Sequence, residues 1–184
     1  GLVSGEELYG SVDNGSNWTD ITNKVIGTSI TWDGATLSGS STILLEVRDA
    51  VGNSGSQASQ AYVLDTTAPS FTVSSVDISA DTGSDATDFN TKTASQTITG
   101  TLSGGLDTYD ILYGSVDNGS TWTDITNKVS GTSITWDGAT LSGSSSITFK
   151  VGDLAGNTET SNTGTTAYVL DTTNPTTTIS GIDI

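Results

Sequence analysis

The chain has 184 residues, of which 33% are hydrophobic, and its 5 Lys plus Arg and 21 Asp plus Glu give a formal net charge of -16. Such an acidic surface repels nucleic acids and anionic lipids and attracts cations, so we expect no nucleic-acid partner and no membrane insertion. The absence of Cys and His excludes disulfides, thiolate chemistry and the common acid–base and nucleophile arrangements of enzymes.

A long segment of the sequence occurs twice. Residues 8–45 and 112–149 are identical at 33 of 38 positions. The match continues from "DAVGN" (49–53) to "DLAGN" (153–157), and from "AYVLDTTAP" (61–69) to "AYVLDTTNP" (167–175). The repeating unit is therefore about 105 residues long, which is the size of one small domain.

The chain is out of phase with this unit. We expect a first repeat over Gly1–Thr66 that lacks its N-terminal strands, a complete repeat over 67–172 and the first strand of a following repeat over 173–184. Pro69 and Pro175 mark the joints. Either an arbitrary cut through a longer array or an exchange of strands between molecules explains such ends.

Short strands separated by turns are predicted along both repeats. In "TILLEV" (42–47), Ile43, Leu45 and Val47 alternate inward, as Ile147, Phe149 and Val151 do in "SITFKV" (146–151). "SVDNGSTWTDI" (115–125) predicts a hairpin that turns at Asp117-Asn118-Gly119. Further strands of the complete repeat are predicted at 71–78, 96–102, 110–116, 132–137 and 165–171.

About seven short strands in about 100 residues are typical of an immunoglobulin-like β-sandwich. We therefore predict an all-β protein built from tandem immunoglobulin-like β-sandwiches. Large side chains should supply most of each core. The residues expected there are Trp122, Trp136, Tyr113 and Phe149 in the complete repeat, and Trp18, Trp32, Tyr9 and Leu45 in the first.

The sequence resembles the bacterial Ig-like repeats of giant secreted adhesins, the type I-exported, RTX-like surface proteins of Gram-negative bacteria. The resemblance rests on "VDNGSTWTDIT" in the first half of the unit, "VGDLAGN" late in it and "LDTTAP" at the joint. It covers nearly the whole chain. It implies an extracellular or cell-surface stalk of many such domains, stiffened at the joints by calcium.

Calcium prefers six to eight oxygen ligands on flexible loops, and three groups of side chains offer them. The first is the loop after the first strand, the second is the DxxGN loop, and the third is the acidic residue at each joint. The candidate ligands are Asp77, Asp81, Asp85 and Asp88; then Asp49, Asn53, Asp153 and Asn157; then Asp65 and Asp171.

Topology predicts which of these groups meet. In an immunoglobulin sandwich the last strand leaves at the end that holds the loop after the first strand, so Asp171 should lie near Asp81, Asp85 and Asp88. The DxxGN loop lies at the opposite end, so Asp65 should lie near Asp153 and Asn157. The alternative is that each Asp only caps a local turn.

These observations favour a non-enzymatic structural repeat of an extracellular adhesin or surface filament, with neighbouring repeats as its partners. Paired carboxylates could still support glycosidase chemistry, but Glu46 is replaced by Lys150 and Glu7 by Ile111 in the second copy. Two other functions stay open. One is direct binding of a glycan, host or cell-surface target, and the other is a self-assembling fibre subunit completed by strands of neighbouring molecules.

Overall fold

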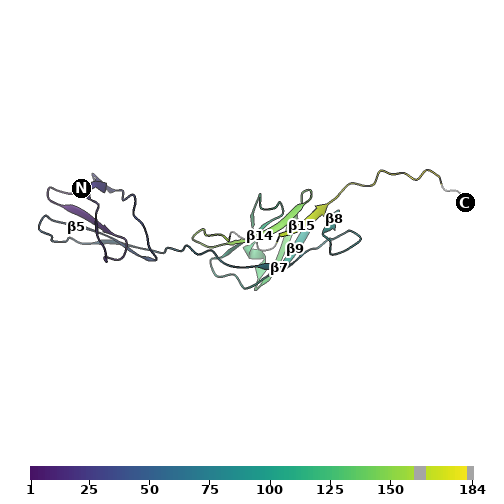
Figure 1. Ribbon diagram of the computed structural model, residues 1–184, viewed down its shortest axis with the longest axis horizontal. Coiled ribbons are helices and arrows are strands. Elements are labelled where there is room, and N and C mark those ends of the chain that lie inside the picture. The colour runs from purple at the N-terminus through teal and green to yellow at the C-terminus, as the bar shows by residue number, and fades with distance from the viewer. Residues whose placement is uncertain (160–164, 182–184) are drawn as a thin grey trace. The chain divides into compact units, whose positions relative to one another are not determined.

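The computed structural model describes residues 1–159 and 165–181, and nearly all regular structure in that part of the chain is β-strand (Figure 1). This confirms the predicted all-β class. The helical segments described are single 3-10 turns, η1 (Thr22–Lys24) and η2 (Thr126–Lys128). Neither is long enough to cross a membrane. By its contacts the chain divides into two compact units, Gly1–Thr66 and Thr67–Ile184.

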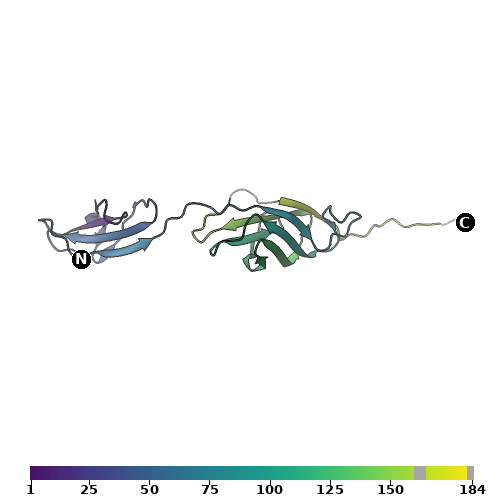
Figure 2. The ribbon, with the colours of Figure 1, turned by 90° about the horizontal axis from the view of Figure 1, so that it is seen from below.

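The second unit is a sandwich of two sheets (Figure 2). One sheet has the strand order β12-β13-β9-β7 and the other β11-β10-β14-β15-β8. This is the ABED and CFG order of an immunoglobulin-type sandwich, with a short strand added at each edge of the second sheet. The strands are β7 (Val73–Ile78), β8 (Asn90–Thr91), β9 (Ser95–Leu102), β10 (Ile111–Ser115), β11 (Thr123–Asp124), β12 (Val129–Ser130), β13 (Ser133–Thr140), β14 (Ser145–Gly152) and β15 (Thr165–Leu170).

The core of the second unit lies between these sheets. Ile147, Phe149 and Val151 of β14 are fully buried, as their alternation predicted. Trp136 of β13, which is 7% exposed, packs against Gly114 of β10, where any Cβ would collide with the indole ring. Glycine at position 114 therefore lets the tryptophan fill the space between the two sheets.

Two aromatic residues that the sequence assigned to this core lie on the outer face of the sheet instead. Tyr113 follows the buried Leu112, so it points outward, opposite Lys150 in the pairing of β10 with β14. The Lys150 ammonium lies 5.1 Å from the centre of the Tyr113 ring and 4.4 Å from that of Trp122. Strand alternation places the Tyr113 ring outside the core, and the attraction of the Lys150 cation to the ring faces holds Trp122 beside it.

In the first unit, too, a Tyr ring and a Trp ring lie against one cation outside the core, and here the cation is Arg48. The Arg48 guanidinium lies 4.2 Å from the Tyr9 ring centre and 5.1 Å from that of Trp18, so these two rings are also outside the core. Arg48 donates a hydrogen bond of 2.5 Å to the buried Glu46 carboxylate. Acceptance of a hydrogen bond from Gln57 is the main reason why the pKa of Glu46 is lowered.

The predicted hairpin is present and is held by its aspartate. Asn118 and Gly119 take positive φ values of 57° and 82°, which suit a tight turn. The Asp117 carboxylate accepts hydrogen bonds from the Thr121 hydroxyl, the Thr121 amide and the Ser115 hydroxyl, in that order of influence, and they lower its pKa to about 2. The first unit repeats this arrangement at Asp13, whose pKa is also about 2.

The first unit contains only part of the sandwich. Its main sheet has the order β2-β1-β5-β6, and a separate two-stranded sheet pairs β3 with β4. No described residue forms a counterpart of β7 or β9 in this unit. As a result Trp32 and Leu45, which were expected to form a core, are only half-buried. The strands are β1 (Glu7–Ser11), β2 (Thr19–Asp20), β3 (Val25–Ile26), β4 (Ser29–Ile30), β5 (Ser41–Arg48) and β6 (Ala58–Tyr62).

The segment after β15 was expected to begin another repeat. Residues 173–181 form no strand, and Ile179 is 87% exposed. The last three residues, 182–184, lie outside the described part of the chain. That 173–184 is the first strand of a following repeat stays a prediction.

Because the core is enclosed only in the second unit, truncation of matching core side chains should lower the free energy of unfolding of the two units by different amounts. We expect Phe149→Ala to lower the free energy of unfolding of the second unit by about 3–5 kcal/mol, because it removes a fully buried ring. Leu45→Ala, at the matching position of the first unit, should cost about 1–2 kcal/mol because Leu45 is half-buried. Hydrogen exchange followed by mass spectrometry measures each unit separately. Equal costs at the two positions would contradict the difference in burial.

Candidate cation site at the end of the second unit

The loop after β7 and the last strand meet at one end of the second unit. β15 pairs in parallel with β8, with Val169 opposite Asn90 and Leu170 opposite Thr91. The Val169 amide donates to the Phe89 carbonyl at 3.0 Å, and the Asp171 amide donates to the Thr91 carbonyl at 2.9 Å. The chain therefore leaves the unit hydrogen-bonded to the loop of residues 79–90, at the end where the topology predicted it.

A buried polar pair anchors the base of this loop. The Thr91 hydroxyl donates to the Ala80 carbonyl at 2.6 Å and accepts from the Thr93 amide at 3.0 Å. The Gln96 side chain accepts from the Ala80 amide at 2.9 Å and donates to the Thr93 carbonyl at 2.7 Å. Thr91 and Gln96 are only 4% and 2% exposed, so these bonds form in a region that water hardly reaches.

Asp81 holds the other side of the loop. One oxygen of its carboxylate, Oδ2, accepts from the Phe89 amide at 2.9 Å. Phe89 has a φ of 60°, a left-handed conformation that is strained for a side chain of this size. The second oxygen, Oδ1, is buried and has no hydrogen-bond partner within the described residues. Asp81 thus has a buried acceptor that a cation or water could use.

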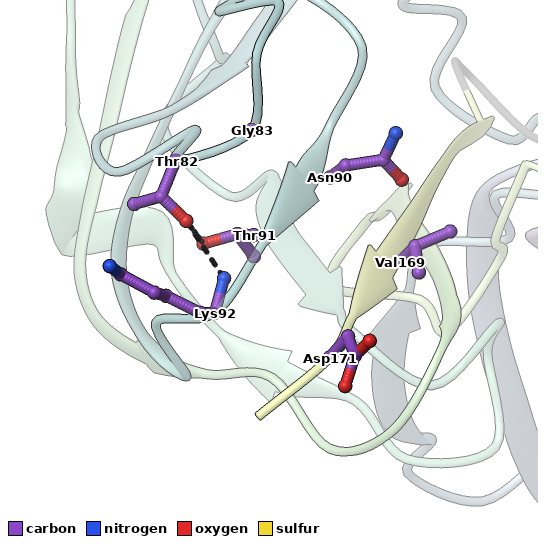
Figure 3. A pocket seen from close by; sticks show the side chains of 7 residues that line it. All are labelled: Thr82, Gly83, Asn90, Thr91, Lys92, Val169 and Asp171. Atoms are coloured by element: carbon purple, nitrogen blue, oxygen red, sulfur yellow. Dashed lines mark hydrogen bonds between the residues drawn. The ribbon is translucent and has the colours of Figure 1, made fainter. Parts of the chain in front are cut away.

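Beside the loop lies an open hollow of about 310 Å³. Figure 3 shows the residues that line it, which are Thr82, Gly83, Asn90, Thr91, Lys92, Val169 and Asp171. The Thr82 hydroxyl accepts from the Lys92 amide at 2.8 Å, which ties the two walls of the loop together. Asp171 brings a negative charge to the hollow and Lys92 a positive one, so the lysine opposes a cation there.

Most of the other predicted ligands at this end cap local turns. Asp85 accepts from the Thr87 amide and hydroxyl, at 3.0 and 2.7 Å, and Asp88 accepts from the Asn90 amide and side chain, at 3.0 and 2.7 Å. Asp171 accepts from the Thr173 amide at 2.8 Å. Asp77 lies within β7 and not in the loop after it, and it accepts from the amide of the next residue, Ile78, at 2.8 Å. The bonds of Asp85, Asp88 and Asp171 use their carboxylates as turn caps.

The DxxGN loops close on themselves in the same way. Asp153 accepts from the Asn157 amide at 2.9 Å and from the Asn157 side chain at 2.8 Å. Asp49 and Asn53 repeat this pair in the first unit, at 2.9 and 2.7 Å. The side-chain bond is the main cause of the lowered pKa of both aspartates. The loops hold carboxylates that stay charged at neutral pH and are already engaged.

The predicted ligands are therefore distributed over several places. Within residues 1–159 and 165–181, no three Asp or Glu side chains come together in a way that could hold a metal ion. The expected proximity of Asp65 to Asp153 and Asn157 joins the two units and stays a prediction. Asp81 is the ligand candidate with an unused buried oxygen, and any cation bound there would take its remaining oxygens from backbone carbonyls and water.

Sequence reasoning missed three residues that shape this end of the unit. Thr91 and Phe89 stand in a run without clear strand alternation, and β8 is too short to recognise by its pattern. Lys92 is a single charge in a polar segment, and no sequence pattern marks it. The rarity of cations is a signal for Lys92 alone, since the whole chain has 5 Lys plus Arg.

Comparison with known proteins gives no independent identification. No protein-family model matches the chain, and no curated protein matches it.

The anchoring of the loop can be tested at Thr91. We expect Thr91→Val to lower the free energy of unfolding of the second unit by about 1–3 kcal/mol, because it leaves the Thr93 amide without its buried acceptor. The same substitution should also accelerate amide hydrogen exchange in residues 79–93. Thr99→Val, on an exposed position of β9, is the matched control and should change neither quantity. An unchanged stability for Thr91→Val would show that water replaces the hydroxyl without cost.

Proposed function

We propose that this chain is a structural spacer repeat of an extracellular adhesin or surface filament, and not an enzyme. The observation that carries the proposal is the parallel pairing of β8 with β15. β8 belongs to the N-terminal part of the second unit, and β15 is its last strand. A repeat with this pairing is suited to bear tension along the chain.

The parallel direction of β8 and β15 explains why the pair can bear tension along the chain. Tension pulls the N-terminal side of the unit backward along β8 and its C-terminal side forward along β15. Parallel strands loaded in this way slide past one another, so the Val169 and Asp171 amide bonds resist together instead of breaking one after another. The bonds lie next to Phe89 and Thr91, which the loop network anchors.

The repetition of the unit supports the same function. A chain that needs length instead of one unique site can use the same domain many times, and each unit then contacts mainly its neighbours. The resemblance to adhesin repeats points the same way. A directly glycan-binding module is less well supported, because sugars stack on free aromatic faces, and the Tyr113 and Trp122 rings are covered on one side by Lys150.

Force spectroscopy on the chain, held by its two ends, tests the proposal. At about 3.5 Å per residue, the span from β7 to β15 should release roughly 340 Å of chain and the span from β1 to β6 roughly 200 Å, which identifies each event. We expect Val169→Pro to lower the unfolding force of the longer event, because it removes the amide that bonds to Phe89. Val169→Ala keeps that amide and should leave the force nearly unchanged. If both variants unfold at the wild-type force, the parallel pair bears no load.

Calcium is proposed as the stiffening ion, bound at Asp81 at the end of the unit. We expect calcium to raise the melting temperature of the second unit relative to EDTA, by a free energy of about 2.7 kcal/mol when the ion is present at about 100 times its Kd. Asp81→Asn should remove most of the increase. Asp107→Asn, beyond the opposite end of β9, should keep it. If the melting temperature is the same in calcium and in EDTA, calcium does not bind at Asp81, and this part of the proposal is wrong.

A further inference from the structure

Each hairpin carries an Asn-Gly pair at its turn. The sequence contains two such pairs, Asn14-Gly15 and Asn118-Gly119, and both asparagines are exposed. Asparagine before glycine is chemically labile, because glycine has no side chain that shields its backbone nitrogen from the asparagine side chain. The two pairs therefore form the turns and are also candidates for spontaneous chemical modification.

The reaction at such a pair needs no enzyme and no oxidant. The glycine nitrogen gives up its proton and attacks Cγ of the asparagine, a carbon–nitrogen bond forms, and the side-chain nitrogen leaves as ammonia. Water then opens the resulting succinimide ring at either of its carbonyls. The product is aspartate, or isoaspartate, in which the main chain runs through the former side chain and gains a methylene group. The sequence of steps is neutral in electrons and replaces an amide with a carboxylate.

The folded hairpin opposes the first step at Gly119. The Gly119 amide donates to the Ser115 hydroxyl at 2.8 Å, and this hydroxyl donates to the Asp117 carboxylate at 2.7 Å. Ser115 is only 2% exposed, so water hardly competes for these bonds. The nitrogen therefore keeps its proton in a hydrogen bond, and the negative charge of Asp117 disfavours a second negative charge beside it.

The conformation of the turn opposes the attack on Cγ. Asn118 and Gly119 both have positive φ, and the Ser120 amide donates to the Asp117 carbonyl at 3.3 Å, which defines a type I′ turn. The Asn118 amide donates to the Ser146 carbonyl at 3.0 Å and fastens the turn to β14. Closure of the ring requires Asn118 to rotate about its Cα–C bond and leave this conformation, so the turn has to open first.

The first unit holds its Asn-Gly pair in the same way. The Gly15 amide donates to the Ser11 hydroxyl at 2.9 Å, and this hydroxyl donates to the Asp13 carboxylate at 2.7 Å. The Asn14 amide donates to the Thr42 carbonyl at 3.0 Å. Ser11 is buried like its counterpart. In both units a buried serine thus holds the glycine amide that would have to react.

We infer that Asn118-Gly119 is a latent deamidation site that the Ser115 hydroxyl keeps closed while the second unit is folded. Opening of the hairpin frees the Gly119 nitrogen for the reaction. Isoaspartate then lengthens the backbone between Asp117 and Thr121, whose mutual hydrogen bonds hold the hairpin. Because ammonia is lost, the modification is a permanent mark of units that have opened. The inference depends on neither calcium binding nor the spacer function.

Incubation of the full chain in mildly alkaline buffer, folded and in guanidinium chloride, tests the protection by the fold. Trypsin cuts after Lys24, Lys92 and Lys128, so the peptides 1–24 and 93–128 report the two Asn-Gly pairs separately in a mass spectrometer. Incubation in heavy-oxygen water labels the new carboxyl group, which distinguishes it from modification during digestion in ordinary water. We expect deamidation of Asn118 to be at least about tenfold slower in the folded chain.

Ser115→Ala tests the role of the hydroxyl. The substitution removes the acceptor of the Gly119 amide, so deamidation of Asn118 in the folded chain should accelerate about fivefold. Asn14 in the same molecule keeps Ser11 and should react at its wild-type rate, which makes it an internal control.

Ile98→Ala separates local opening of the hairpin from unfolding of the whole unit. It removes a fully buried side chain of β9 and leaves the hairpin unchanged, so it should accelerate deamidation of Asn118 less than Ser115→Ala does. A wild-type rate in Ser115→Ala, or an acceleration that Ile98→Ala matches, would overturn the role of the hydroxyl. Equal rates in the folded and the denatured wild-type chain would overturn the latent site itself, and that comparison depends on no variant.

Discussion

The two units differ in how far the apolar inner face of the main sheet is covered, and the enclosed core of the second unit depends on that cover. In the second unit Phe149 and its neighbours on β14 meet the side chains of β9 and β13, and Trp136 fills the space against Gly114. Burial of such side chains is the dominant favourable contribution to folding. In the first unit the corresponding sheet exists and Trp32 packs against Gly10 in the same way, but the opposite layer is incomplete. The difference between an enclosed core and an accessible surface follows from that one layer.

The pairing of the covering strand also determines local structure. The eight residues "SITWDGAT" form the whole of β13 in the second unit, but in the first unit only Ser29 and Ile30 of the same eight are in a strand. The local propensities of the two segments are identical. What differs is the availability of β9, whose backbone groups satisfy those of β13. Whether these eight residues form a strand therefore depends on a pairing partner and not on their sequence alone.

The end of the second unit joins three features in one small region. The buried Thr91 anchors the loop, Asp81 holds Phe89 in a left-handed conformation, and the last strand bonds to the carbonyls of Phe89 and Thr91. Force carried by the last strand would reach this loop directly. A cation bound at Asp81 would act on the same bonds, so load-bearing and ion binding would be coupled through a short hydrogen-bond path.

The sequence by itself determined the repeat, the β class, the inward alternation of β14 and the hairpin at Asp117, because each depends on residues close together in the chain. It also determined that the end of the last strand and the loop after the first one meet, through the known order of the sandwich. It did not determine that Tyr113 lies on the outer face, since a shift of one residue exchanges the two faces of a strand, or that Trp122 lies there beside Lys150. Nor did it reveal the short parallel pair of β8 with β15 or the place of Lys92. Only the tertiary structure decided these. The last two depend on contacts between residues about 80 positions apart, which no local pattern records.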